Sequence, residues 1–274
     1  MIRSRRPRGS RWMFVLMMAL AATLVLTLGG CSKRVSTTVT GDEIDPDERP
    51  SGGDRFIDHT VADGETLALV ADNYYGDPGR AERIARDNGL EDPARIIPGS
   101  LLRLNFSDDE WSSARQRSAA LVPYNKGVDL LAEERLAEAE KQFDLALNTA
   151  PDLVAARYNL ALVQLKRGKS ELALVHLEEL TALRPDDPDF RFARGNALFQ
   201  GTRFDEAAEQ FRAALAIDPD LKRAAFGLAR SLQEGGHDAE AVAAWGRYLE
   251  LDDSSSWAAA ARRHLKTLQD ADGP

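Results

Sequence analysis

Apolar and polar positions divide the chain into three stretches with different patterns. Residues 12–28 form a nearly uninterrupted apolar run, which follows five arginines. Residues 32–57 are almost entirely polar and hold little that could be buried, so they are expected to be disordered. Beyond residue 58, apolar residues recur at the spacings of strands and helices, and folded structure is therefore expected there.

Residues 58–106 combine two strand patterns with two helical ones. A strand is predicted around 59–61 and another around 101–104. Between them lie one helical stretch that begins at Glu65 and a second around 81–88. The order strand, helix, helix, strand within fewer than fifty residues predicts a small compact domain.

This segment resembles the LysM family, whose members bind glycans that contain N-acetylglucosamine, such as bacterial peptidoglycan. The matches run in order along the whole segment, and residues 75–78 look like a long-loop variant of the family. The resemblance implies a βααβ fold and peptidoglycan binding. The residues that carry it are Val61, Gly64, Thr66, Leu67, Val70, Ala71, Tyr74, Ile84, Asn88, Leu90, Asp92, Pro93, Ile96, Pro98, Gly99, Leu101 and Leu104.

The resemblance also implies where the sugar would lie, in a shallow groove between the loop after the first strand and the loop before the last. Backbone groups at the glycine turns would bond the acetamido groups, and Ile and Pro side chains would pack on the apolar face of the ring. Glu65 stands where the family more often has Asp, and it would keep an acceptor for the sugar there. The alternative is that these residues only cap a helix and close the core. The implied glycan site comprises Gly64, Glu65, Thr66, Leu67, Asp92, Ile96, Ile97, Pro98 and Gly99.

From Ser107 onward the pattern is helical. Ser107 and Glu110 have the spacing of a capping box, which predicts a connecting helix over 107–122. Pro123 is expected to start a new helix or to kink this one, because proline lacks the N–H that a helix interior needs. A last helix is predicted over 254–270, where three serines can cap it.

Residues 123–253 repeat with a period of 34. Small residues recur at two positions of each repeat, where two helices would cross closely, and a large apolar residue recurs at a third. Proline ends three of the repeats, since the residue before proline avoids the α region. The recurring residues are Gly127, Ala161, Gly195 and Ala229; Ala139, Ala173, Ala207 and Ala241; Phe143, Leu177, Phe211 and Trp245; and Pro151, Pro185 and Pro219.

This pattern resembles four tetratricopeptide repeats, each a helix-turn-helix pair. The predicted fold class is therefore mostly α, with a small βααβ LysM domain before an all-α solenoid of four repeats. The last helix would cap the solenoid, because a terminal repeat cannot bury its own apolar face.

The tetratricopeptide resemblance implies a concave groove that is lined by the first helix of each repeat and suits a protein segment with apolar anchors. The first helix of every repeat carries an aromatic residue at the same position, namely Tyr124, Tyr158, Phe192 and Phe226. Such an aromatic is ordinary for the family, and the alternative is that neighbouring repeats half bury these rings. The Lys and Asn with which some relatives clamp a peptide carboxylate are absent, because Tyr124 and Val128 stand in their places. The implied groove comprises Tyr124, Val128, Tyr158, Leu162, Phe192, Asn196, Phe199, Phe226 and Arg230.

Residues 1–30 have the composition of an export signal, with arginines before the apolar run. Small residues then precede Cys31, the only cysteine of the chain. This arrangement resembles a bacterial lipobox, which implies cleavage before Cys31 and lipid attachment to it. A plain signal peptide and an uncleaved membrane helix are the alternatives. By the enterobacterial pattern, Ser32 implies an outer-membrane anchor that faces the periplasm, with residues 31–57 as a tether.

Charge and motif content limit the function classes. The formal charge of −9 becomes −14 without residues 1–30, which hold five arginines and no acid. This acid excess argues against nucleic acid as a partner, since phosphates need Lys and Arg. The four histidines lie in different predicted elements without metal-ligand spacing, and no phosphate-loop or nucleophile motif is present. We therefore expect no catalysis and no cofactor.

Together these patterns predict a non-enzymatic cell-envelope lipoprotein, which binds peptidoglycan through residues 58–106 and recruits an unidentified protein through its repeats. One alternative is an adaptor or regulator that delivers a cell-wall hydrolase or synthase. Another is that residues 58–106 are only a spacer and the repeats alone bind a partner.

Overall fold

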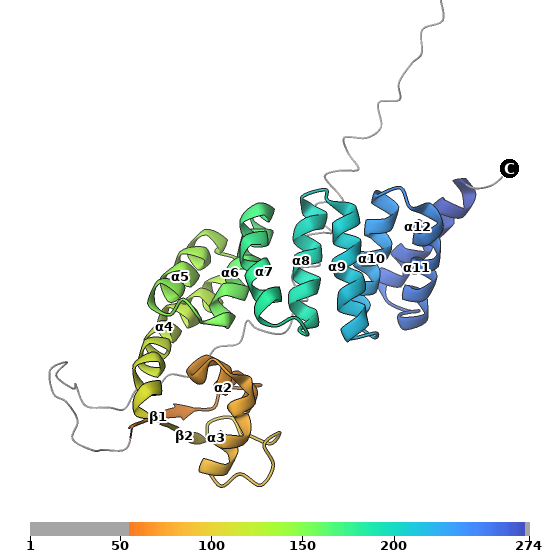
Figure 1. Cartoon of the computed structure of the whole chain (residues 1–274). Coiled ribbons are helices and arrows are strands. Elements are labelled where there is room, and N and C mark those ends of the chain that lie inside the picture. The colour runs from red at the N-terminus through yellow and green to blue at the C-terminus, as the bar shows by residue number, and fades with distance from the viewer. Residues whose placement is uncertain (1–54, 272–274) are drawn as a thin grey trace, which may run out of the picture. The chain divides into compact units, whose positions relative to one another are not determined.

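The computed structural model describes residues 55–271, and these are mostly helical (Figure 1). They form two compact units. The N-terminal unit comprises residues 55–167 and 172–185, and the C-terminal unit comprises residues 168–171 and 186–271. The predicted signal peptide, the predicted lipidated cysteine and most of the predicted tether lie outside the described residues. Within the described part of the chain, no helix is long and apolar enough to cross a membrane.

The N-terminal unit begins with a two-stranded antiparallel sheet and the helices between its strands. Strand β1 (Arg55–Thr60) pairs with β2 (Leu101–Phe106). Between them lie α2 (Leu67–Tyr75), the 3₁₀ turn η1 (Pro78–Arg80) and α3 (Ala81–Asp87). The apolar sides of these elements share one core, whose buried members include Val70, Tyr74, Ile84, Leu102 and Leu104.

Strand β1 begins at Arg55, three residues before the predicted start of the folded segment at 58. Residues 55–57 therefore belong to the folded unit and not to the tether. Two apolar residues account for the longer strand. The Phe56 ring lies against the guanidinium of Arg103, 3.9 Å from the ring centre, and Ile57 packs against the core.

Four helices follow β2, namely α4 (Asp108–Ala132), α5 (Leu136–Thr149), α6 (Val154–Lys166) and α7 (Ser170–Leu183). The capping box predicted at the start of α4 is confirmed. The backbone N–H of Glu110 donates to Ser107 Oγ at 3.4 Å, and that of Ser107 donates to Glu110 Oε2 at 2.9 Å. These two reciprocal hydrogen bonds thus fix the N-terminus of α4.

Helix α4 continues through Pro123, so the predicted helix boundary at 122 does not exist. One helix of 25 residues serves both as the connector and as the first helix of the first repeat. Proline removes the N–H that would donate to the carbonyl of Ala119, four residues earlier, and its ring crowds that carbonyl. Ala119 is exposed, so water can replace that donor without unfolding the turn.

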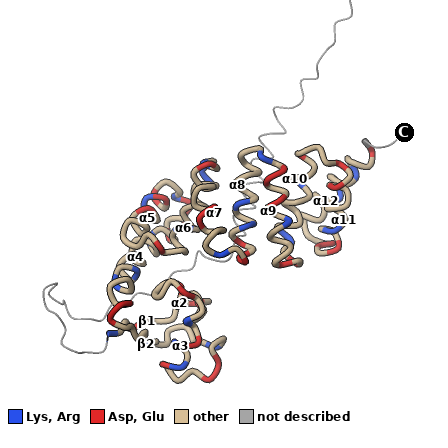
Figure 2. The backbone as a smooth tube through the Cα atoms, viewed as in Figure 1, with Lys and Arg blue, Asp and Glu red and all other residues tan. Residues whose placement is uncertain are grey.

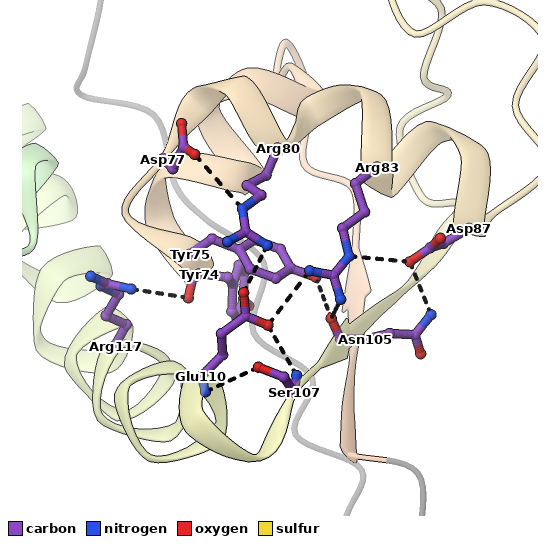
Figure 3. Close-up of polar contacts among 10 residues, drawn as sticks. All are labelled: Tyr74, Tyr75, Asp77, Arg80, Arg83, Asp87, Asn105, Ser107, Glu110 and Arg117. Atoms are coloured by element: carbon purple, nitrogen blue, oxygen red, sulfur yellow. Dashed lines mark hydrogen bonds and ion pairs between the residues drawn. The ribbon is translucent and has the colours of Figure 1, made fainter.

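Polar contacts join the βααβ part to α4 (Figure 3). Glu110 receives two guanidinium groups: Arg80 Nη1 lies 2.7 Å from its Oε1, and Arg83 Nη1 lies 3.5 Å from its Oε2. Within the βααβ part, the Tyr75 hydroxyl and Arg83 both donate to the carbonyl of Asn105 in β2, at 3.0 and 3.2 Å. Burial raises the pKa of Tyr75 to about 12, so this phenol stays a donor at neutral pH.

The C-terminal unit contains α8 (Pro188–Gln200), α9 (Phe204–Ile217), α10 (Lys222–Glu234), α11 (Asp238–Leu251) and α12 (Ser256–Ala271). The Phe211 ring of α9 explains the glycines of its two neighbours. A Cβ atom on either Gly195 or Gly227 would lie 2.7 Å from that ring. At the end of the unit, Ser255 Oγ accepts from the N–H groups of Trp257 and Ala258, both at 3.1 Å, and caps α12.

Candidate functional site

Two loops of the βααβ part lie side by side, because backbone hydrogen bonds join them. The Val61 N–H donates to the Ser100 carbonyl at 2.9 Å, and the Gly99 N–H donates to the Val61 carbonyl at 2.8 Å. The loop after β1 therefore adjoins the loop before β2. These are the two loops that the predicted glycan site requires.

Six of the nine predicted glycan-site residues are exposed, and Ile96 is half-buried. Ile97 stands out because 72% of its surface is exposed, and Leu101, at the start of β2, is 62% exposed. The Thr66 hydroxyl accepts from the Leu69 N–H at 3.2 Å, where it caps α2. The Asp92 carboxylate accepts from the Ala94 N–H at 2.9 Å. The exposed residues are Gly64, Thr66, Asp92, Ile97, Pro98 and Gly99.

Two members of the predicted glycan site are not accessible. Leu67 is 2% exposed and belongs to the core. Glu65 is 5% exposed, and its Oε2 atom accepts from the Ala62 N–H at 2.9 Å and lies 2.8 Å from His59 Nε2. The expectation that the Glu65 side chain offers an acceptor to sugar is therefore wrong. The carboxylate turns inward because it satisfies the backbone of the loop on which it lies.

Glu65 is part of a buried polar group that the sequence did not reveal. His59 Nε2 faces Glu65, and its Nδ1 lies 3.3 Å from the Tyr74 hydroxyl. Burial raises the pKa of Tyr74, and the nearby charge of Glu65 raises it further. The three residues come from a strand, a turn and a helix, so only their tertiary apposition identifies the group. Because Glu65 bonds the backbone of Ala62, this buried group stabilises the loop 61–66.

The aromatic column predicted to line a concave groove lies in the core instead. Tyr124, Tyr158, Phe192 and Phe226 are each at most 3% exposed. Three of them contact the large residue of their partner helix: the ring centres are 5.9 Å apart for Tyr124 and Phe143, 5.8 Å for Phe192 and Phe211, and 4.9 Å for Phe226 and Trp245. Burial between the two helices of a hairpin is therefore their role, and they present no open surface.

The remaining groove candidates differ between the two units. In the N-terminal unit, Val128 and Leu162 are apolar and only 6% and 4% exposed, so they contribute to packing and offer no polar group. In the C-terminal unit, the guanidinium of Arg230 lies 4.7 Å from the centre of the Phe199 ring, and both residues are partly exposed. Asn196 is 7% exposed and polar. Of the predicted groove, only this last group is equipped for polar recognition.

His264 lies near Arg230, outside the predicted groove. Its ring stacks on that of Trp245, with centres 5.0 Å apart and planes 9° apart. Burial lowers the pKa of His264, and the charges of Arg230 and Arg263 lower it further. Within residues 55–271, no cluster of three or more His, Cys, Asp or Glu side chains could hold a metal ion.

Comparison with protein families supports the repeat pattern. A family model described as tetratricopeptide repeat matches residues 124–188, 158–222 and 192–256. These matches start 34 residues apart, at Tyr124, Tyr158 and Phe192. The aromatic that opens each match is therefore the one found in the core of its helix pair.

Two curated relatives match part of the chain. DnaJ homolog subfamily C member 3 of Mus musculus is 39% identical over 93 residues, which is 34% of this chain and 18% of the relative. Tetratricopeptide repeat protein 13 of Homo sapiens is 28% identical over 125 residues, which is 44% of this chain and 14% of the relative. The chain thus spans less than a fifth of the length of these relatives.

Two solved structures share the fold at low identity. The MamA RS-1 ArsTM double mutant has a TM-score of 0.52 at 16% identity, and the match covers 56% of this chain and 84% of that one. A crystal structure of MamA has a TM-score of 0.50 at 15% identity, covering 53% of this chain and 83% of that one. Identities of this size speak for the fold alone.

Proposed function

Residues 124–256 are tetratricopeptide repeats, and we propose that they form the protein-interaction part of an envelope lipoprotein that also binds peptidoglycan. In this proposal residues 58–106 are a LysM domain, and Cys31 carries the lipid anchor. The anchor lies in the outer membrane and faces the periplasm. The protein connects lipid, glycan and a protein partner, and it catalyses no reaction.

The observation that favours glycan binding is the exposure of Ile97 and Leu101 beside the paired loops. Large aliphatic side chains that remain 72% and 62% exposed offer apolar area to a sugar ring. Gly99 has a φ of 83°, in the left-handed region that favours glycine, so the backbone turns sharply next to Ile97. An apolar side chain next to turn backbone matches the two faces of an N-acetylated sugar.

The buried group of His59, Glu65 and Tyr74 has a supporting part in this proposal. Glu65 holds the Ala62 N–H and thereby fixes the loop that follows β1. A fixed loop binds more tightly than a mobile one, because less conformational entropy is lost on binding. Thr66 and Asp92 act in the same way through their local hydrogen bonds.

The test is co-sedimentation of residues 32–274 with purified peptidoglycan sacculi. The variant Ile97→Asp removes the apolar contact, and Val122→Asp makes the same change at another apolar residue, which is 62% exposed on α4. We expect Val122→Asp to sediment like the parent. Ile97→Asp should sediment about tenfold less well or worse, since burying such a side chain contributes about 1.5–3 kcal/mol.

A point variant is sharper here than deletion of residues 59–106. Arg117 of α4 donates to the Tyr74 carbonyl at 3.4 Å, and Arg184, which follows α7, pairs with Asp72, so a deletion would remove the partners of both arginines. If Ile97→Asp and Val122→Asp both sediment like the parent, the loop face does not bind the wall. If the parent does not sediment at all, peptidoglycan binding is wrong and the repeats alone carry the function.

A further inference from the structure

One face of the C-terminal unit gathers polar groups from three helices. Asn196 and Phe199 lie one turn apart on α8, and Arg230 and Gln233 lie one turn apart on α10. The guanidinium of Arg230 covers the Phe199 ring at 4.7 Å, and Gln233 Oε1 accepts from Trp245 Nε1 at 3.1 Å. His264 of α12 stacks on the same Trp245. We call these five residues, Asn196, Phe199, Arg230, Gln233 and His264, the Arg230 face.

Hydrogen-bond donors on this face lack acceptors. Asn196 is 7% exposed, and its Nδ2 atom has no hydrogen-bond partner. The Nε atom of Arg230 is also buried without a partner. A buried donor without an acceptor destabilises a protein by about 1–3 kcal/mol. The two donors lie on the first helices of successive repeats, Asn196 on α8 and Arg230 on α10.

The charge of Arg230 is only partly compensated within the chain. Its nearest carboxylate oxygen is Glu234 Oε1, which lies 3.8 Å from Nη2 and so beyond hydrogen-bond distance. Only 15% of the Arg230 side chain is exposed. Burial lowers the pKa of Arg230, and Glu234 offsets this in part. A guanidinium in this position gains most from a further carboxylate, because ionised acceptors form the strongest hydrogen bonds.

We propose that the Arg230 face binds a protein segment through an Asp or Glu side chain. Arg230 and Asn196 donate to the carboxylate, and Phe199 packs against an apolar neighbour of that residue. The proposal rests on the protein-recruiting role of the repeats and adds the location and the chemistry of the partner. Both unpaired groups are donors, so the ligand must supply acceptors.

The distribution of charge favours a single carboxylate over a polyanion. With a formal charge of −9, the chain repels nucleic acid at long range. Figure 2 shows acidic and basic residues interspersed along the backbone of α8 to α12. A single guanidinium beside an amide suits one carboxylate in a peptide better than a run of phosphates.

The test is fluorescence anisotropy of the full chain with a labelled peptide that has blocked ends and in which Glu alternates with Leu. A matched peptide has Gln in place of Glu. We expect the Glu peptide to bind about tenfold or more tightly than the Gln peptide, since a charge-assisted hydrogen bond contributes about 1.5–3 kcal/mol. Added salt should weaken the Glu peptide and leave the Gln peptide unchanged.

Variants assign the effect to the face. Arg230→Gln should weaken the Glu peptide about tenfold or more, and Arg230→Lys should restore part of the affinity because it keeps the charge. Asn196→Asp should also weaken binding, because it places a carboxylate of the chain on the face. The matched control is Arg212→Gln, which removes an arginine that pairs with Glu240 at 2.6 Å and is 47% exposed. This control should bind like the parent.

The proposal is overturned if Glu and Gln peptides bind equally. It is also overturned if Arg230→Gln and Asn196→Asp both bind like the Arg212→Gln control, or if a single-stranded oligonucleotide displaces the Glu peptide at equal concentration. None of these results affects sedimentation with sacculi. If the parent chain still captures an envelope protein while the Glu peptide fails, the repeats recruit a protein by another surface. If it captures none, the proposed recruiting function itself is wrong.

Discussion

The two units place different residues at the same position of the repeat. In the N-terminal unit, the first-helix position four residues after the buried aromatic holds Val128 and Leu162, which are buried and apolar. In the C-terminal unit, the same position holds Asn196 and Arg230, which carry unpaired donors. One position of the fold thus serves packing in one unit, while in the other it offers hydrogen bonds to a ligand.

This difference indicates where the chain gives up stability. An apolar side chain at this buried position contributes through burial, at about 25 cal/mol for each Å² removed from water. A buried donor without a partner opposes folding. Asn196 and Arg230 therefore stabilise the C-terminal unit less than apolar residues would at this position. A ligand that accepts their hydrogen bonds would restore this free energy on binding.

The largest predicted effect tests whether the two units are otherwise equivalent. Phe143 in α5 and Phe211 in α9 occupy the same repeat position and are at most 1% exposed. Phe143→Ala and Phe211→Ala should each lower the free energy of unfolding by about 3–5 kcal/mol, because each leaves a cavity between two helices. Chemical denaturation followed by circular dichroism measures both.

A clear inequality between these two variants would contradict the equivalence of the repeats. The exposed Leu145 of α5 provides the control, since it is 50% exposed and Leu145→Ala should cost far less than either.

Periodicity predicted the helical hairpins well, because small residues must recur wherever two helices touch. Gly127 shows the reason directly, since a Cβ atom there would lie 2.6 Å from the Phe143 ring. The capping box at Ser107 was equally readable, since it depends on residues three apart. Contacts between neighbours in sequence, and contacts repeated at a fixed period, are the ones that a single sequence displays.

The wrong predictions concern the exposure of side chains and the residues that they contact. The repeat position of Tyr124 was predicted correctly, but its burial depends on Phe143 of the partner helix. Glu65 was expected to face a ligand, yet it turns to His59, which comes from the preceding strand. In both cases the competing partner lies on another element. The direction of a side chain therefore required the tertiary structure.

Two glycines of the C-terminal unit give an intermediate effect with opposite signs. Gly195→Ala would place a methyl group 2.7 Å from the Phe211 ring, so it should destabilise by about 1–3 kcal/mol through overpacking. Gly246 lies within α11, and nothing is within 4 Å of an added Cβ atom. Gly246→Ala should therefore stabilise by about 0.5–1 kcal/mol. The same denaturation experiment measures the change in the free energy of unfolding for both variants. A stabilising Gly195→Ala would show that α8 and α9 can accommodate the extra methyl group.

The smallest effect tests the electrostatics of the Arg230 face. Burial, Arg230 and Arg263 all hold the pKa of His264 below its ordinary value. The folded state then binds this proton less readily than the unfolded chain does. The folded state therefore loses stability as the pH falls below about 6.5, the pKa of histidine in the unfolded chain. Above that pH the group contributes nothing to the pH dependence.

Arg230→Gln removes one of the three causes, so the pKa of His264 should rise and the loss of stability in acid should become smaller. Titration of the His264 ring by NMR measures the shift directly, with Arg212→Gln as the control of equal charge change. An unchanged His264 pKa in Arg230→Gln would mean that the two groups do not sense each other across the face. The guanidinium would then be better compensated than its 3.8 Å distance to Glu234 indicates, and the case for a carboxylate ligand would weaken with it.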